Sequence, residues 1–330
     1  MDAFQFIRAE SLSTAAQHGA GAKFVAGGTN LIDMMKLDVE RPKVVVDING
    51  LPLDRIVEGP GTSLFLGALA RNADVAQHPA VQGNYAVLSQ ALLSGASPQL
   101  RNMATTGGNL LQRTRCPYFR DTAHACNKRE PGSGCSAIGG HDRMLAVLGT
   151  SEHCIATNPS DQNVALTALE AKLQIQGAGG TRTVPISEFY KLPGTTPHIE
   201  TVLQPGELIT GVMLTEPPAG NKSVYVKLRD RAAYEFALAS AAVVIQLNGR
   251  RIEYARVALG GVGTVPWRSP EAEALLHGAP ADPVSFRRAA EAALKNAHPQ
   301  SENGFKIELA RRCLVRALTT ATSSDTSRTL

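Results

Sequence analysis

Four of the five cysteines lie within one short window of the sequence: Cys116, Cys126, Cys135 and Cys154. Thiolate sulfur is a ligand of zinc and of the iron in iron–sulfur clusters, and four thiolates suit either group. No two of these cysteines have the Cys-x-x-Cys spacing of common zinc fingers and ribbons. Three interpretations therefore stay open for this site: a [4Fe–4S] cluster, a zinc ion, and disulfides or free thiols.

The segment from Arg113 to Thr150 carries three of these cysteines and has no apolar period. It is far longer than a normal connection between secondary-structure elements, and such loops are usually functional or disordered. Metal–sulfur bonds would order it in place of a hydrophobic face. Basic side chains near the cysteines would offset the charge of the thiolates: Arg113, Arg115, Arg120, Lys128 and Arg129.

Two loops contain a pair of glycines next to a predicted helix, Ala26–Asp33 and Asn102–Gln112. Paired glycines let the backbone approach a ligand, and free N–H groups at a helix start favour an anion such as a pyrophosphate. A third loop places Asp161 at a helix start, where it either accepts a ribose hydroxyl or complements the helix dipole. Each loop alone can be a tight turn. Together they fit a long, phosphate-containing ligand, although none has the Rossmann glycine fingerprint.

Apolar periodicity predicts the elements that must position these groups. The first part of the chain alternates helices and strands, with helices at 13–18, 30–38 and 86–96 and strands at 23–26, 43–48 and 64–69. Asn30 should cap helix 30–38, with Asp33 as its reciprocal partner. After the irregular segment we expect a strand at 154–157, a helix at 160–171 and strands at 172–176, 181–186 and 208–214.

A break at Pro217–Lys222 precedes a change in the order of the predicted strands and helices. Strands at 223–230, 238–247 and 251–262 follow one another, as in an antiparallel sheet, and helices at 285–297 and 304–318 then cover it. Cys313 lies at helical spacing from Phe305 and Leu309, so we expect a small buried side chain there. The tail 319–330 lacks apolar content and is predicted to be flexible.

Composition excludes several classes of protein. The chain has 330 residues, enough for two or three domains, and 43% hydrophobic and 19% charged residues, as in a folded globular protein. The formal charge of +4 is mild and has no basic block, so we expect no nucleic-acid partner. No apolar run is long enough for membrane insertion, and the first residues lack the features of a signal peptide.

Five segments together resemble one family: KFVAGGTNLIDMMKL, LRNMATTGGNLLQRTRCPYF, CNKREPGSGC, CIATNPSD and YVKLRDRAAYEFALAS. In this order they are similar to the FAD-binding medium subunits of the molybdenum hydroxylases (the xanthine dehydrogenase family), most of all to the flavin subunits of bacterial periplasmic aldehyde oxidoreductases. The double-glycine loops are family-wide, whereas the cysteine insertion is shared with few relatives.

The resemblance implies an α+β fold. A two-subdomain FAD-binding domain of the vanillyl-alcohol-oxidase (PCMH) type would span 1–219, with subdomains of about 1–57 and 58–219 and a [4Fe–4S] insertion at about 113–154. A sheet-and-helix domain of the CO dehydrogenase flavoprotein type would span 220–318. The flexible tail 319–330 would follow.

The resemblance also implies which residues bind cofactors. Cys116, Cys126, Cys135 and Cys154 match the ligands of a [4Fe–4S] cluster. The residues implied for FAD wrap its pyrophosphate, contact its phosphates and ribitol, hold a ribose hydroxyl or pack near its ring: Lys23, Phe24, Val25, Ala26, Gly27, Gly28, Thr29, Asn30, Leu31, Thr105, Thr106, Gly107, Gly108, Asn109, Asp161, Ile209 and Lys227.

The implied activity is that of an oxidoreductase subunit that transfers electrons and oxidises no substrate alone. A large partner subunit would carry the molybdenum cofactor and oxidise an aldehyde, and a small partner with two [2Fe–2S] clusters would pass electrons to this chain's FAD and on to an external acceptor. We expect a periplasmic location, reached by co-export with a signal-bearing partner, with the cytoplasm as the alternative. Other hypotheses are the flavin subunit of a xanthine, CO or hydroxybenzoyl-CoA enzyme, a stand-alone NAD(P)H-dependent flavoenzyme, and a zinc-stabilised adaptor.

Overall fold

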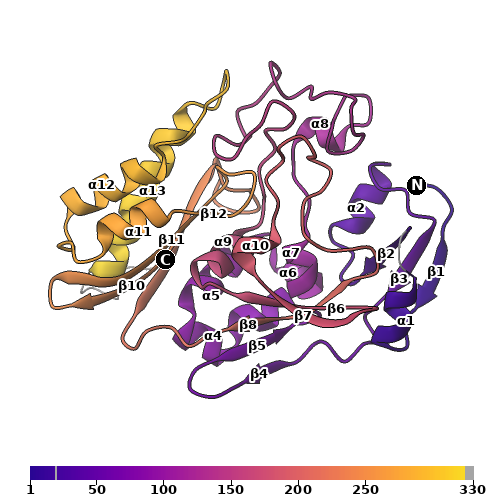
Figure 1. The fold of residues 1–330 in the computed structure, drawn as a ribbon, viewed down its shortest axis with the longest axis horizontal. Helices are drawn as coiled ribbons and strands as arrows, with labels where there is room; N and C mark the ends of the chain where they lie inside the picture. Colours follow the sequence, from indigo (N-terminus) through magenta and orange to yellow (C-terminus); the bar gives the residue numbers. More distant parts are fainter. Residues whose placement is uncertain (19–20, 324–330) are drawn as a thin grey trace.

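The computed structural model describes residues 1–18 and 21–323, which form three sheets and the helices that cover them (Figure 1). The first sheet has three parallel strands in the order β1-β3-β2: β1 (Gln5–Arg8), β2 (Ala22–Val25) and β3 (Val44–Asp47). Helices α1 (Leu12–Gln17) and α2 (Leu31–Lys36) connect them. Val45 and Val46 of β3 pack into two different clusters on opposite faces, which explains the unbroken apolar run VVV in a central strand.

The second sheet has five antiparallel strands in the order β4-β5-β8-β6-β7. Its strands are β4 (Ile56–Glu58), β5 (Leu64–Gly67), β6 (Lys172–Gly177), β7 (Gly180–Pro185) and β8 (Leu208–Leu214). Helices lie between and beside these strands in the sequence: α3 (Asn72–Gln77), α4 (Pro79–Asn84), α5 (Ala86–Ser94), α6 (Pro98–Met103), α7 (Thr106–Leu110), α8 (Pro117–Arg120), α9 (Asp161–Ala168) and α10 (Ile186–Phe189).

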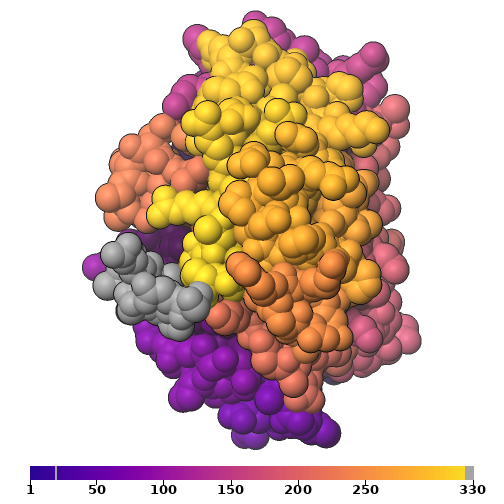
Figure 2. Space-filling view, turned by 90° about the vertical axis from the view of Figure 1, so that its left-hand side faces the viewer, coloured from indigo at the N-terminus to yellow at the C-terminus, as the bar shows by residue number. Residues whose placement is uncertain are grey.

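The third sheet is antiparallel, in the order β12-β11-β10-β9. It is built from β9 (Lys222–Leu228), β10 (Ala239–Asn248), β11 (Arg251–Gly260) and β12 (Trp267–Arg268). Helices α11 (Pro270–Leu276), α12 (Pro283–Ala293) and α13 (Phe305–Thr322) cover one face and form a continuous surface of the molecule (Figure 2). Helices α5 and α9 contact the sheet from the other side. Val243 and Val244 of β10 therefore belong to two different cores, and this strand is apolar on both sides.

Four sequence predictions differ from the structure. The segment 154–157 is not a strand, because its backbone makes single bonds to separate loops, such as Ala146 N–H to Ile155 O, instead of joining a ladder. Helix α13 continues to Thr322, so residues 319–322 are helical, while the rest of the predicted flexible tail, 324–330, lies outside the described residues. Apolar periodicity predicts Leu88, Leu92 and Leu93 on one face of helix 86–96, but Leu93 of α5 is exposed while Leu88 and Leu92 are buried. The reciprocal cap of Asn30 and Asp33 is absent, because both side chains bind the cysteine segment.

The cysteine segment is ordered and is attached to the third sheet and its helices. Asp142 is fully buried and accepts hydrogen bonds from the backbone N–H and hydroxyl of Ser301 and the N–H of Glu302. The Lys306 ammonium donates to the carbonyls of Met144, Leu145 and Gly261 at 3.1, 2.8 and 2.5 Å. These buried polar contacts fix the loop between the third and fourth cysteines to the start of α13.

We expect Lys306 to make stability depend on pH. Burial lowers the pKa of the Lys306 ammonium to about 7, and the charge of Arg143 acts in the same direction. The unfolded chain keeps this proton up to about pH 10.4, so between these values the unfolded state binds more protons and the free energy of unfolding rises with pH. A Lys306→Met variant lacks this contribution. Urea unfolding at about pH 7 and about pH 9.5 should show the stability gap between wild type and variant widening with pH, and a constant gap would contradict it.

Candidate functional site

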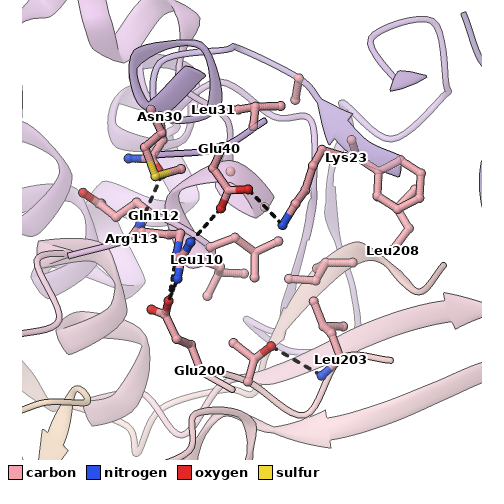
Figure 3. A pocket seen from close by; sticks show the side chains of 18 of the residues that line it. Lys23, Asn30, Leu31, Glu40, Leu110, Gln112, Arg113, Glu200, Leu203 and Leu208 are labelled. Carbon is pink, nitrogen blue, oxygen red and sulfur yellow. Dashed lines mark hydrogen bonds and ion pairs between the residues drawn. The ribbon is translucent and has the colours of Figure 1, made fainter. Parts of the chain in front are cut away.

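A cavity of about 900 Å³ lies between the first and second sheets (Figure 3). Its walls come from the loop between β2 and α2, the start of α7, the first residues of β8 and the irregular segment 190–207. Ligand pockets usually measure about 300–1,000 Å³, so this cavity is near the upper end and has room for a long ligand.

The first double-glycine loop needs both glycines for different reasons. A Cβ on Gly27 would lie 1.9 Å from the carbonyl oxygen of Met103, at the end of α6. Gly28 has φ +71°, a conformation that residues with a Cβ rarely adopt. Gly27 is therefore required for packing of the loop on α6, and Gly28 for the turn into α2.

The second double-glycine loop uses its hydroxyls within the protein. The Thr105 hydroxyl accepts a hydrogen bond from the Gly108 N–H at 3.2 Å, which caps α7. The Thr106 hydroxyl donates to the Ala70 carbonyl at 3.1 Å. Both threonines are buried, and only Thr105 lines the cavity. These hydroxyls therefore shape the loop, while Gly107 and Gly108 present the backbone to the cavity.

Asp161 forms a buried ion pair that sequence reasoning did not anticipate. Its carboxylate accepts hydrogen bonds from Lys227 Nζ at 2.8 Å and from the Tyr225 hydroxyl at 2.5 Å. Burial and the charge of Asp161 raise the pKa of Tyr225 well above its ordinary value. Asp161 and Lys227 were predicted as separate cofactor contacts, and the structure brings them together beside a second, smaller cavity.

The predicted cofactor-binding residues divide into three groups. Twelve line the large cavity: Lys23, Phe24, Ala26, Gly27, Gly28, Thr29, Asn30, Leu31, Thr105, Gly107, Gly108 and Ile209. Asn109, Asp161 and Lys227 line the smaller cavity and not the large one. Val25 and Thr106 line neither, because Val25 packs into the core of the first sheet and Thr106 faces Ala70. The structure thus assembles most of the set, and direct contact of each residue with FAD stays a prediction.

A charged network in the wall of the cavity was missed in the sequence. Arg113 pairs with Glu40 and Glu200, both at 2.6 Å, and Lys23 reaches Glu40 at 3.4 Å (Figure 3). Burial alone would raise the pKa of Glu200, but the charges of Arg113 and Lys128 hold it below the ordinary value. No local pattern marks this network, because its members lie far apart in the chain.

Replacing Arg113 by methionine should destabilise the protein strongly. The variant leaves Glu40 and Glu200 largely buried without their shared cation. Breaking buried pairs costs about 3–5 kcal/mol, and since this one keeps some contact with solvent we expect about 2–4 kcal/mol. Urea unfolding measures the loss. Arg312→Ala, which removes an exposed pair with Glu308 on α13, is the control and should cost no more than about 0.5 kcal/mol. Equal losses in both variants would contradict the argument.

The four cysteines of the irregular segment surround one small cavity. Cys116, Cys126 and Cys154 are buried in one cluster with Phe119, and Cys135 packs against it. The cysteines come from separate positions in the segment. The backbones of Cys126 and Cys135 form an isolated antiparallel β-bridge, and the backbones of Ser151 and Cys154 form another. All five cysteines are free, so the disulfide interpretation finds no support here.

A cluster or a metal ion at the four cysteines stays a prediction. Within the described ranges, no three Cys, His, Asp or Glu side chains lie close enough to hold one metal ion. Burial raises the pKa of the Cys116 thiol to about 12, although the N–H groups of Phe119 and Tyr118 act in the opposite direction. Binding a metal here must therefore displace protons.

The basic residues near the cysteines have different partners. Arg115 and Arg120 pair with Asp33 on α2 at 3.0 and 2.6 Å. Arg129 donates to backbone carbonyls, including that of Tyr118. Burial raises the pKa of the Cys154 thiol, and the charge of Lys128 acts against it. Carboxylates pair with Arg113, Arg115 and Arg120, whereas carbonyls leave the charge of Arg129 in place, so the joint role of the five as counter-charge stays a prediction.

Unpartnered polar atoms in the cavity walls fit a bound cofactor. Asn30 binds the Arg113 N–H through Oδ1, while its buried Nδ2 has no partner. Buried polar atoms in proteins are normally hydrogen-bonded, so an unpartnered donor beside a glycine loop suits a ligand with phosphate or carbonyl oxygens.

Comparison with known proteins assigns the family. The FAD binding domain in molybdopterin dehydrogenase matches residues 2–217, and the CO dehydrogenase flavoprotein C-terminal domain matches residues 224–321. The chain is a medium subunit of the molybdenum hydroxylase family. The resemblance of the sequence and the predicted α+β fold are thereby confirmed.

Two relatives and one solved structure illustrate how similar these medium subunits are. The chain is 52% identical to the aldehyde oxidoreductase FAD-binding subunit PaoB of Escherichia coli, over 97% of this chain and 99% of that one. It is 32% identical to the glyceraldehyde dehydrogenase medium chain of Sulfolobus acidocaldarius, over 82% and 79%. The carbon monoxide dehydrogenase structure from Hydrogenophaga pseudoflava superposes with a TM-score of 0.76 at 27% identity and covers 97% of both chains.

The family assigns the chain as an oxidoreductase subunit that binds FAD. FAD supplies the redox chemistry, and the protein binds and orients it. Over residues 1–18 and 21–323, no helix is long and apolar enough to cross a membrane.

Proposed function

We propose that this medium subunit carries FAD and a [4Fe–4S] cluster in a heterotrimeric molybdenum-dependent aldehyde oxidoreductase. The observation that carries the substrate class is the 52% identity to an aldehyde oxidoreductase FAD-binding subunit along almost the whole chain. The partners are a large molybdenum subunit, which oxidises the aldehyde, and a small subunit with two [2Fe–2S] clusters. This chain passes the electrons to an external acceptor.

The residues of this chain hold FAD and exclude water. The backbone around Gly28 and Gly107 accepts the pyrophosphate, with the exposed Lys23 at the edge of the cavity to balance its charge. Ile209 supplies an apolar wall for the ring. The charged network of Arg113, Glu40 and Glu200 keeps its own charges paired, so it fixes the wall without attracting the phosphates strongly.

The cluster proposal rests on the four cysteines around one cavity. The wall between this site and the FAD cavity is thin, because Lys128, Cys154 and Ala156 line both. A cluster at these cysteines would therefore lie beside the flavin site, within the short range that electron transfer needs.

Metal and flavin analysis tests this function. The full chain, expressed with its partner subunits and alone, should contain FAD, and the chain alone should contain about four irons and four sulfides. Reduction should give the EPR signal of a [4Fe–4S] cluster. Zinc without flavin would support the adaptor hypothesis instead. Reduction of the flavin by NAD(P)H, but not by an aldehyde in the presence of the partners, would support a stand-alone flavoenzyme. Turnover of a purine, CO or a CoA thioester by the complex would support a xanthine, CO or hydroxybenzoyl-CoA enzyme instead.

The periplasm is the proposed location, because the sequence resembles subunits that are exported with a signal-bearing partner. A cluster assembled before export would protect the cysteines from the oxidising compartment. Cell fractionation should find the chain in the periplasm only when the partner with its signal is present. Its presence in the cytoplasmic fraction under both conditions would favour the alternative.

A further inference from the structure

The two double-glycine loops of the FAD cavity come from different parts of the fold. The first follows β2 of the first sheet, and the second leads into α7, which packs beside β5 and β8 of the second sheet. Both loops contribute to the wall of the cavity. A ligand that contacts both loops binds tightly only when they are already held at the right separation, because ordering them on binding costs free energy.

Arg71 holds the second loop. Its backbone forms an isolated bridge with Thr105, the residue that caps α7. Its guanidinium Nη1 donates to the carbonyl oxygen of Met103 at 2.6 Å. The same oxygen is the atom against which Gly27 of the first loop packs. Arg71 therefore contacts the second loop through its backbone, and the border between the two loops through its side chain.

Asn49 holds the first loop. It follows β3 at a turn, where its backbone N–H and its side-chain Nδ2 both donate to Oδ1 of Asp47, at 3.0 and 2.7 Å. The same Nδ2 donates to the carbonyl oxygen of Ala26 at 3.0 Å, immediately before Gly27. A primary amide has two N–H donors, so both are used here.

A direct hydrogen bond joins the two side chains. Arg71 Nη2 donates to Oδ1 of Asn49 at 3.2 Å. These partners fix the orientation of the amide, since turning it over would place Nδ2 against the guanidinium and Oδ1 against a carboxylate and a carbonyl. One chain of hydrogen bonds thus runs from the first loop through both side chains to the Met103 carbonyl.

Neither side chain belongs to the cavity itself. Asn49 and Arg71 line neither the large nor the smaller cavity, and Asn49 is exposed at the surface. Exposed hydrogen bonds contribute little to overall stability, because water competes for the same groups. We therefore expect this pair to affect the spacing of the loops rather than folding.

We infer that Asn49 and Arg71 are positioning residues that set the separation of the two glycine loops, and thereby the affinity for the diphosphate of FAD, without touching the cofactor. The inference rests on FAD binding in the proposed function and adds two residues that lie outside the cavity. Without the pair the loops are free to separate, so part of the interaction with FAD is offset by bringing them together again.

Dissociation constants for FAD, measured on the whole complex after removal of its flavin, test the inference. Asn49→Asp keeps the shape of the side chain and the acceptor for Arg71, but it cannot donate to Ala26 and places a second carboxylate beside Asp47. It should weaken FAD binding about three- to tenfold, the effect of about one hydrogen bond. Arg71→Gln should have a similar effect, and Arg71→Lys, which keeps one charged donor, should recover part of the affinity.

Asn248→Asp is the matched control. Asn248 also precedes a glycine, is exposed in the turn between β10 and β11, and lies outside the wall of the cavity. Aspartate is accepted before glycine in such turns, so this variant should bind FAD like wild type. The FAD-free complexes of Asn49→Asp and Asn248→Asp should unfold at similar temperatures, because both changes lie at the surface. A large drop in Asn49→Asp alone would indicate a structural role and count against the inference.

Equal FAD affinity in wild type and Asn49→Asp would overturn the inference, and so would an Arg71→Lys variant that binds as weakly as Arg71→Gln. If Asn49→Asp does not fold, the two Arg71 variants decide. Failure of the variants at both positions to fold would overturn it as well, because the pair would then be part of the folded framework. A wild-type complex without any flavin would instead refute the proposed function.

Discussion

Replacing Gly27 by alanine should weaken FAD binding strongly. The added Cβ would lie 1.9 Å from the carbonyl oxygen of Met103 and 2.7 Å from its carbonyl carbon, which are backbone atoms that no rotamer change can move. The same oxygen accepts a hydrogen bond from Arg71 at 2.6 Å, which holds it in place. The glycine loop must therefore move away from α6 and change the cavity wall. Overpacking costs about 1–3 kcal/mol, and at about 1.4 kcal/mol per factor of ten we expect FAD affinity to fall roughly 5- to 150-fold.

Flavin content after gel filtration and the dissociation constant of the apoprotein for FAD measure this effect. Gly83→Ala is the matched control, because a Cβ on Gly83 of α4 meets no atom within 4 Å. Alanine is also the better helix former by about 1 kcal/mol, so this variant should keep its FAD and unfold at the same or a higher temperature. If Gly27→Ala binds FAD as tightly as wild type, the close contact with Met103 does not constrain the loop.

Replacing cysteines one at a time should distinguish loss of iron from loss of FAD. Cys135 lines only the small cysteine cavity, so Cys135→Ser should lose most of the iron and keep FAD. Cys154 lines both this cavity and the FAD cavity, so Cys154→Ser should lose iron and weaken FAD binding as well. Iron and sulfide analysis, with flavin absorbance on the same samples, distinguishes the two results.

Cys313 provides the control for this series. It is buried in α13, away from the other four, and burial raises its pKa to about 12, so it is an inert core side chain as predicted. Cys313→Ala should keep full iron and full FAD, with a small loss of stability from the missing sulfur. Unchanged iron in Cys135→Ser would show that the ligand assignment is wrong.

The sequence predicted the long, periodic elements well, because their apolar faces decide where they lie. The three strands β9, β10 and β11 were predicted in the right order and as an antiparallel sheet. The short strands β1, β4 and β12 were missed, since two to four residues carry too little pattern to detect. The helices α3, α4, α6 and α11 were also missed, because six or seven residues make at most about two turns and show little periodicity.

The site was predicted less completely than the fold. Glycine loops and cysteine clusters can be recognised in a sequence, because few other residues can replace them. The Arg113 network gives no such signal, since arginine and glutamate are ordinary on any surface and Glu40 is separated from Arg113 by most of a domain. Asp161 was predicted as a possible ribose contact at a helix start, whereas its ion-pair partner Lys227 lies in the third sheet, and only tertiary structure brings the two together.

The attachment of the cysteine loop to α13 also sets an order for biosynthesis. All four clustered cysteines leave the ribosome long before Ser301, Glu302 and Lys306, which hold Asp142 and the carbonyls of Met144 and Leu145. Until α13 is translated, these contacts of Asp142, Met144 and Leu145 cannot form, although earlier residues such as Tyr118 already hold part of the loop. The four thiols are therefore made well before the loop between Cys135 and Cys154 can reach its final structure, which requires the last helix to dock.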